Sequence, residues 1–246
     1  MSQNTIHKIN TALWDDRGSE VIGVTALPEL GAFVSEENHH LFGSVTGKKV
    51  LEIGCGRGHS LQYLGERKAA ELWGLDISEK QIAQTKQYLT ECGLSAKLIC
   101  SPMEEECSIP VNYFDIVYAI YAIGWTTDLD VTFLRIASYL KKGGVFIFSW
   151  SHQIHKCVVF ENGSYTFKKS YFDESWYLDS WSGAEFKLSN RMLSTYVNAL
   201  AKVGFFIEQM IEKPDEEILR SCDENDEFVK RTRMVPKVFV IKARKL

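Results

Sequence analysis

Three glycines stand at alternate positions in the stretch Val50–Ser60, which reads V-L-E-I-G-C-G-R-G-H-S. They are Gly54, Gly56 and Gly58. A glycine lets the backbone turn sharply and approach a ligand closely, because it has no Cβ. The helix expected next would present free N–H groups to an anionic group. The pattern therefore predicts a turn that binds a cofactor.

Asp76 ends the next predicted strand, 22 residues after Gly54. A carboxylate can accept hydrogen bonds from both hydroxyls of a ribose, and such charge-assisted pairs are strong. A dinucleotide-binding turn has the spacing G-x-G-x-x-G, which would place a glycine where this chain has His59. The spacing therefore favours S-adenosylmethionine (SAM) over a nicotinamide or flavin cofactor. An aspartate that only caps a helix or turn is the alternative for Asp76.

Strands and helices that alternate along the chain would position these residues. Capping residues and glycines predict the start of a helix at 61–67 and helices at 79–92, 129–140 and 190–203. Apolar runs predict strands at 49–53, 71–76, 96–100, 114–120, 145–150, 205–211 and 237–242. This order requires an α/β fold with right-handed crossovers. We expect a Rossmann-like, seven-stranded, mostly parallel sheet with helices on both faces.

Residues 151–189 interrupt this alternation. The pair Asn162–Gly163 lies between two apolar runs and predicts a β-hairpin. We expect this insertion to lie over the carboxyl edge of the sheet, where open α/β sheets bind ligands. The chain is therefore predicted to form one domain, 1–246. Its parts would be an N-terminal helical cover (1–45), a cofactor-binding core (46–150), the insertion (151–189), and a C-terminal helix and strands (190–246).

Four motifs resemble those of the class I SAM-dependent methyltransferases, specifically the small-molecule branch of the "methyltransferase type 11" kind. They are E-I-G-C-G-R-G, G-L-D-I-S, F-D-I-V-Y-A-I and Y-L-K-K-G-G-V-F-I-F-S, all within 45–150. The resemblance continues more weakly through 190–205 and 233–243. It implies that SAM is the cofactor and that S-adenosylhomocysteine is the product formed from it.

The resemblance also implies which residues hold the cofactor. Pro102 stands where the family often has an acidic residue. The backbone or Glu104 would therefore contact the adenine amine instead. Residues facing the methionine part would be Glu52, Gly54, Cys55 and Gly56. Around the ribose and adenine would be Asp76, Ile77, Met103 and Glu104, and near the sulfonium Ile120 and Tyr121.

Aromatic side chains suit a cationic sulfur, because their faces attract cations and their bulk excludes water. The chain offers such residues ahead of the core, within it and in the insertion. The predicted substrate side is lined by Trp14, Trp125, Tyr171, Trp176 and Trp181. The alternative is that these rings only pack the insertion onto the sheet.

Methyl transfer depends mainly on alignment, and it needs a general base only if a proton must leave the acceptor early. His152 and His155 follow the predicted fifth strand and are the candidates for that base. Ordinary structural histidines are the alternative. The H-x-x-H spacing of His152 and His155 does not predict a metal site, because no third ligand accompanies the pair.

Composition narrows the class of function. The 246-residue chain carries a net charge of -4, which disfavours nucleic acid as a partner. It has no apolar run long enough for a membrane span, no secretory signal, and six cysteines without a CxxC pair, so we expect a cytoplasmic protein with reduced thiols.

The sequence thus predicts an enzyme that methylates nitrogen or oxygen of a small-molecule substrate. The alternatives are a nicotinamide-dependent oxidoreductase, a non-catalytic SAM-binding protein, or a methyltransferase with an RNA or protein substrate. Nothing in the sequence indicates the oligomeric state.

Overall fold

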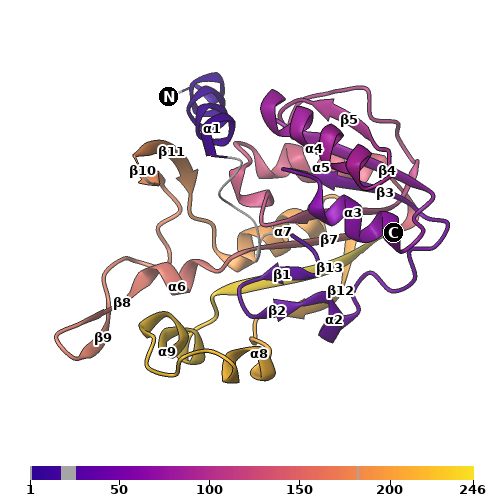
Figure 1. Cartoon of the computed structure of the whole chain (residues 1–246). Coiled ribbons are helices and arrows are strands. Elements are labelled where there is room, and N and C mark those ends of the chain that lie inside the picture. The colour runs from indigo at the N-terminus through magenta and orange to yellow at the C-terminus, as the bar shows by residue number, and fades with distance from the viewer. Residues whose placement is uncertain (1, 18–25, 182) are drawn as a thin grey trace.

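The computed structural model describes residues 2–17, 26–181 and 183–246. A sheet of seven strands runs through this part of the chain, in the spatial order β12-β13-β7-β6-β3-β4-β5 (Figure 1). Its strands are β3 (Lys49–Ile53), β4 (Glu71–Asp76), β5 (Lys97–Cys100), β6 (Phe114–Ile120), β7 (Leu140–Ser151), β12 (Phe205–Ile211) and β13 (Val238–Lys245). Strands β3 to β7 are parallel to one another, whereas β13 is antiparallel to both β7 and β12. The predicted Rossmann-like, mostly parallel sheet is confirmed.

The chain changes direction across the sheet next to β3. It runs outward from β3 through β4 to β5 and then returns to the other side of β3 as β6. The loops that follow the carboxyl ends of β3 and β6 therefore run in opposite directions from the place where the strand order reverses. Ligands of open α/β sheets bind in the crevice that such a reversal creates.

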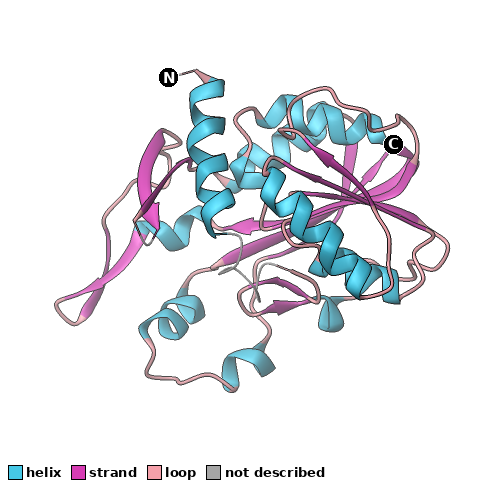
Figure 2. Ribbon diagram, turned by 45° about the horizontal axis from the view of Figure 1, so that its top comes forward, coloured by secondary structure: helices cyan, strands magenta, loops and turns pink. Residues whose placement is uncertain are grey.

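Helices cover both faces of the sheet (Figure 2). One face buries Leu51, Val117 and Phe148 under α5 (Leu129–Tyr139) and α7 (Leu193–Lys202). The other face buries Val50, Ile116 and Tyr118 under α3 (His59–Glu66) and α4 (Glu79–Glu91). Neighbouring residues of β3 and β6 thus face opposite cores, which explains why these strands are apolar at almost every position.

Helix α5 and strand β7 meet differently from the prediction of a helix at 129–140 and a strand at 145–150. Helix α5 ends at Tyr139, and β7 begins directly at Leu140, which pairs with Phe114. The next paired residue is Val145, opposite Ile116. Gly143 and Gly144 therefore form a bulge inside β7 rather than a loop before it, because the extra residues can leave the ladder without ending it.

The segment 151–189 contains the predicted hairpin and two elements that the sequence did not predict. The hairpin of β8 (Val158–Glu161) and β9 (Ser164–Phe167) protrudes from the body, at the lower left of Figure 1. A short helix, α6 (Gln153–Cys157), precedes it, and a second hairpin of β10 (Trp176–Trp181) and β11 (Ala184–Ser189) follows. The aromatic residues of β10 did not show the strict alternation that marks a strand.

The N-terminal part is not wholly helical, contrary to the prediction for 1–45. Helix α1 (Gln3–Arg17) is followed by a small β-hairpin, β1 (Glu29–Gly31) and β2 (Val34–Ser35), and by α2 (Glu36–His39). Two further helices that were not predicted lie before β13, α8 (Glu216–Arg220) and α9 (Glu227–Met234). None of the described helices is both long enough and apolar enough to cross a membrane.

Truncating a core residue of α7 tests the prediction that 190–246 folds with the rest as one domain. The Leu200 side chain is fully buried between α7 and the sheet, so Leu200→Ala should lower the free energy of unfolding by about 2–5 kcal/mol. Urea unfolding followed by tryptophan fluorescence and by circular dichroism should give one coincident transition. Lys202→Ala, on the exposed side of the same helix, is the control and should change stability by about 1 kcal/mol or less. Two separate transitions would refute the single domain.

Candidate active site

The glycine turn after β3 is fixed against β4. The backbone N–H groups of Gly54 and Cys55 both donate to the Leu75 carbonyl, at 2.7 and 3.0 Å. Gly54 has φ 72°, and a Cβ on it would lie 2.4 Å from the Cβ of Ala122. Any larger residue would therefore push the turn away from the end of β6.

Gly56 is the glycine of this turn that leaves room for a ligand. It has φ 49°, and a Cβ on it would project into open space, with no atom of the described residues within 4 Å. Helix α3 begins just beyond, at His59 after the N-cap residue Gly58, and no side chain caps its first turn. The turn thus offers a backbone cradle beside uncapped N–H groups, the arrangement that suits a polar or anionic ligand group.

Asp76 joins the loops that follow β3 and β4. Its Oδ2 accepts a hydrogen bond from the Gly56 N–H at 2.9 Å, and its Oδ1 accepts one from the Ser78 N–H at 3.0 Å. Burial raises the pKa of Asp76, and these two N–H groups oppose the change. Each carboxylate oxygen still has a free lone pair, so the group can accept further hydrogen bonds from a ligand.

Glu52 lies under the turn in a buried position. Its carboxylate accepts hydrogen bonds from the hydroxyls of Tyr118, at 3.2 Å, and Ser60. Burial raises the pKa of Glu52 well above its usual range, which favours the neutral acid at this position. A protonated carboxyl can donate as well as accept.

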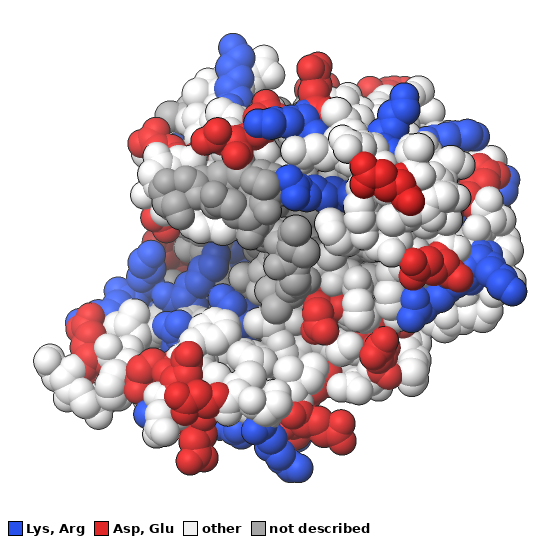
Figure 3. Space-filling model, in the orientation of Figure 1, with Lys and Arg blue, Asp and Glu red and all other residues white. Residues whose placement is uncertain are grey.

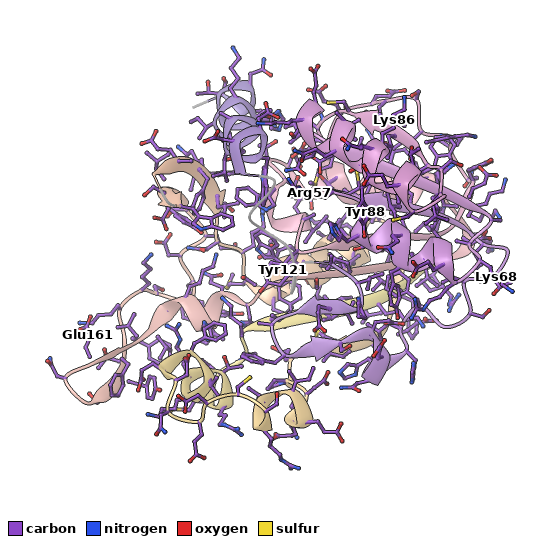
Figure 4. All side chains as sticks on the ribbon, viewed as in Figure 1. Arg57, Lys68, Lys86, Tyr88, Tyr121 and Glu161 are labelled. Carbon is purple, nitrogen blue, oxygen red and sulfur yellow. The ribbon has the colours of Figure 1, made fainter. Side chains whose placement is uncertain are left out.

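A cavity of about 370 Å³ opens above these residues. Its position is the one expected from the reversal of strand order beside β3. In Figure 4 the side chains of Arg57 and Tyr121 lie near the middle of the molecule, whereas Lys68 and Lys86 lie at its periphery. The structure brings all ten predicted cofactor residues to the cavity wall: Glu52, Gly54, Cys55, Gly56, Asp76, Ile77, Met103, Glu104, Ile120 and Tyr121.

Glu104 lines the cavity, but its carboxylate is already engaged. Oε1 accepts hydrogen bonds from the Thr126 hydroxyl at 2.7 Å and from the backbone N–H and hydroxyl of Thr127. Oε2 lies 3.5 Å from His7 Nε2 on α1. Glu104 therefore holds α1 and the loop before α5 around the cavity, and the adenine contact predicted for it stays a prediction.

Tyr121 occupies a strained position at the end of β6. It has φ 54°, a value that non-glycine residues rarely adopt. Its N–H donates to Ser149 Oγ at 3.2 Å, and its hydroxyl accepts from Ser151 Oγ at 3.3 Å. Two contacts from β7 thus hold the ring at the cavity wall, and such retained strain is concentrated at functional sites.

Aromatic rings form the end of the cavity that faces the insertion. Trp125 packs edge-on against Trp14, with centroids 5.1 Å apart, and lies 6.2 Å from Trp150. Trp181 also lines the cavity. Trp150 was not predicted as a site residue, because it lies in an apolar run that predicts a buried strand. Gly124 is needed beside it, since a Cβ there would lie 1.8 Å from the Trp150 ring.

The other two predicted aromatic residues lie elsewhere. Neither Tyr171 nor Trp176 is among the described residues that line the cavity. The Tyr171 hydroxyl accepts a hydrogen bond from the Leu193 N–H at 3.3 Å, and Trp176 packs beside the Arg191 guanidinium. Both instead pack the insertion against the start of α7, the alternative that the sequence left open.

The two candidate base residues also lie away from the cavity wall formed by the described residues. His152 caps α6: its Nδ1 accepts from the Ile154 N–H at 3.2 Å, and its Nε2 lies 2.8 Å from Glu212 Oε1. His155 packs against Phe228, and burial lowers its pKa to about 3. The rings are engaged in structural contacts, so this geometry does not favour the predicted base role.

Helix α1 supplies two cavity residues that the sequence did not predict, His7 and Asn10, beside the predicted Trp14. His7, Asn10 and Trp14 are spaced three and four residues apart and so lie on one helix face, which covers the cavity. Asn10 also joins α1 to β11: its Nδ2 donates to the Lys187 carbonyl at 2.9 Å, and its Oδ1 accepts from the Lys187 N–H at 2.8 Å. The spacing was visible in the sequence, but the helix could not be placed from it.

The cavity fits a nucleoside cofactor with a polar tail. Gln81 lines it, and the Gln81 Oε1 atom is buried without a hydrogen-bond partner in the described chain, as expected if a ligand supplies the donor. Asp76 offers free lone pairs, Ile77 and Met103 offer apolar contact, and Gly56 offers space. Within residues 2–17, 26–181 and 183–246, no group of three His, Cys, Asp or Glu side chains is placed to hold a metal ion.

Comparison with solved structures gives the same fold. A SAM-dependent methyltransferase from Mesorhizobium loti superposes with a TM-score of 0.71 at 22% identity, covering 86% of this chain and 98% of that one. This likeness extends well beyond the core into the segments around it.

Sequence comparison gives the family. The "Methyltransferase domain" family model matches residues 51–148. An uncharacterized protein of Haemophilus influenzae is 31% identical over 219 residues, which cover 84% of each chain. A sterol 24-C-methyltransferase of Aspergillus fumigatus is 35% identical over 113 residues, 45% of this chain and 30% of that one. A ubiquinone biosynthesis O-methyltransferase of Azoarcus is 29% identical over 116 residues, 47% of this chain and 49% of that one. This chain therefore belongs to the class I SAM-dependent methyltransferases of the type 11 branch, and it is an enzyme that uses SAM.

Proposed function

We propose that this enzyme methylates a nitrogen or oxygen atom of a small-molecule acceptor. The observation that carries the proposal is the single continuous cavity that joins the glycine turn and Asp76 to the aromatic wall of Trp125 and Trp150. One end has the polar groups that suit the cofactor, and the other end has mainly apolar walls. A volume of about 370 Å³ is of the size that small ligands occupy.

The methyl acceptor differs between relatives of this chain. The printed names of two relatives specify methylation at carbon for one and at oxygen for the other. A covered cavity and a net charge of -4 support a small molecule over nucleic acid. Transfer to the lone pair of a nitrogen or oxygen atom needs no carbanion, so it does not require the carboxylate-histidine pair of Glu104 and His7 at the cavity wall to act as a base.

Asp76 and the glycine turn would hold the cofactor, with Ile77 and Met103 beside the adenine. When bound, SAM supplies an electrophilic methyl group on a sulfonium. The turn at Gly54–Gly58 would orient the amino-acid part through backbone N–H groups, because their positions are fixed by the bonds to Leu75.

The remaining work of the protein would be alignment and exclusion of water. Alignment of two reactants can contribute about 7–11 kcal/mol to the lowering of a barrier. The rings of Trp14, Trp125 and Trp150 and the strained Tyr121 shape the acceptor end, and α1 covers it. Their faces would also favour the positive charge of the sulfonium by about 0.5–2 kcal/mol each.

Asp76→Ala should weaken binding of S-adenosylhomocysteine by about 1.5–3 kcal/mol, because it removes charge-assisted hydrogen bonds to the ligand. Isothermal titration calorimetry measures this change. Asp226→Ala is a matched control: Asp226 also accepts hydrogen bonds from two backbone N–H groups, of Phe228 and Val229, but it caps α9 away from the cavity. The control should lose stability and keep its affinity. Equal affinities for the wild type and Asp76→Ala would contradict the assignment.

A turnover assay tests both the methylation of small molecules and the role of His152 and His155. The wild type, given SAM and a panel of small amines, alcohols and phenols, should form S-adenosylhomocysteine and an acceptor one methylene heavier by mass spectrometry. The double variant His152→Gln/His155→Gln should have a kcat/KM close to that of the wild type. Removal of a general base would instead lower kcat/KM by roughly 100-fold.

Two results would count against the proposal. A 100-fold loss in the histidine variant, with unchanged S-adenosylhomocysteine binding, would restore the base role. Methyl transfer only to RNA or to protein would refute the small-molecule acceptor.

A further inference from the structure

Lys156 is the charged residue that links the cavity to the insertion. It lies on α6, is half-buried, and lines the cavity together with Ser151 and Trp181. Its Nζ donates to the Tyr177 hydroxyl at 3.1 Å. A lysine on a largely apolar wall is costly unless an anion accompanies it.

Two more lysines lie close enough to Lys156 for their charges to act on it, Lys169 and Lys237, and Arg231 acts in turn on Lys237. Lys169 Nζ lies 5.6 Å from the Tyr177 ring, and Lys156 Nζ lies 5.7 Å from the same ring. Lys237 Nζ lies 5.4 Å from the Phe228 ring. Burial, together with the charges of Lys237 and Lys169, lowers the pKa of Lys156 to about 8. Burial also lowers the pKa of Lys237, and the charge of Arg231 lowers it to a smaller extent.

No carboxylate of the described residues forms an ion pair with Lys156, Lys169, Lys237 or Arg231. The neighbouring lysines differ: Lys168 pairs with Glu161 at 2.5 Å and Lys230 with Glu227 at 3.3 Å. Asp179 acts on Lys156 only at longer range, and Glu212 is bound to His152.

Arg231, whose charge acts on Lys237, has a buried donor that the described residues do not satisfy. Its Nη1 donates to the Val158 carbonyl at 3.0 Å, while its Nε is buried without a hydrogen-bond partner in the described chain. Buried donors in proteins are almost always satisfied. Figure 3 shows blue side chains gathered in a hollow between the β10–β11 hairpin and α9, on a protein whose net charge is negative.

We infer that Lys156, with Lys169 and Lys237, binds an anionic oxygen group, a carboxylate or a phosphate, carried by the methyl acceptor. This inference rests on the proposed function. The apolar part of the acceptor lies among Trp125, Trp150 and Trp181, and its anionic end faces the lysines. The anion supplies the countercharge that the protein lacks at this point, and charge-assisted hydrogen bonds of this kind give both affinity and orientation.

The test compares three ligands of the same chain length, octyl phosphate, octanoate and 1-octanol, by calorimetry on protein saturated with S-adenosylhomocysteine. The pH is 7, below the pKa of about 8, so that Lys156 carries its charge. At least one anion should bind about 10-fold or more tightly than octanol. The tighter of the two anions identifies phosphate or carboxylate as the group.

Two variants and a matched control assign the effect to these lysines. Lys156→Met and Lys169→Met should each lose most of the preference for the anion over octanol. Lys168→Met, next in the chain to Lys169 but paired with Glu161, should keep it. All three should bind S-adenosylhomocysteine as the wild type does.

The outcomes separate this inference from the proposed function. Equal affinity for anions and octanol, or equal losses in the Lys168 and Lys169 variants, overturns the anion site. Weaker S-adenosylhomocysteine binding in Lys156→Met also overturns it, because the lysine would then serve the cofactor. A wild type that binds no S-adenosylhomocysteine refutes the proposed function itself.

Discussion

The Asp76 carboxylate connects the two loops on which the site depends. One oxygen accepts from Gly56 N–H in the loop after β3, and the other accepts from Ser78 N–H at the start of α4. Two loops that leave adjacent parallel strands would otherwise be free to separate, since parallel strands share no tight turn. The bonds to the Leu75 carbonyl add a second connection between the same loops. The cradle at Gly56 is therefore held by the protein's own hydrogen bonds, and preorganisation of this kind reduces the entropy cost of binding.

The cover of the cavity is assembled from parts that lie far apart in the chain. Asn10 joins α1 to β11, Glu104 joins the loop before α5 to His7, and Trp14 packs on Trp125. These contacts are few compared with the two cores that hold the sheet, and two of the three are polar. Regions with fewer buried apolar contacts open at lower free energy than the core. The cover thus depends on fewer buried apolar contacts than the sheet does.

Acidic and basic residues lie at different ends of the cavity, although the net charge of the chain is -4. The cofactor end carries carboxyl groups, Glu52 and Asp76, which suit hydroxyl and amino groups of a ligand. The insertion end carries Lys156 and its neighbouring cations, without paired carboxylates in the described chain. One cavity thus offers opposite electrostatic conditions at its two ends, which would orient an amphiphilic acceptor relative to the methyl group.

The sequence by itself determined the core of the sheet and the set of residues expected around the cofactor. Strands β3, β4, β6 and β12 begin and end where apolar runs predicted, and all ten residues expected around the cofactor line one cavity. These features follow from local signals, since strand, glycine turn and cap are each encoded within about ten residues. Only the tertiary structure decided which distant residues complete the site. Trp150, Lys156 and His7 reach it because sheet order and the docking of α1 bring them there, and the same packing turns His152 and Tyr171 away from it. Contacts between residues so far apart in the chain have no local sequence pattern, because they depend on how whole elements pack.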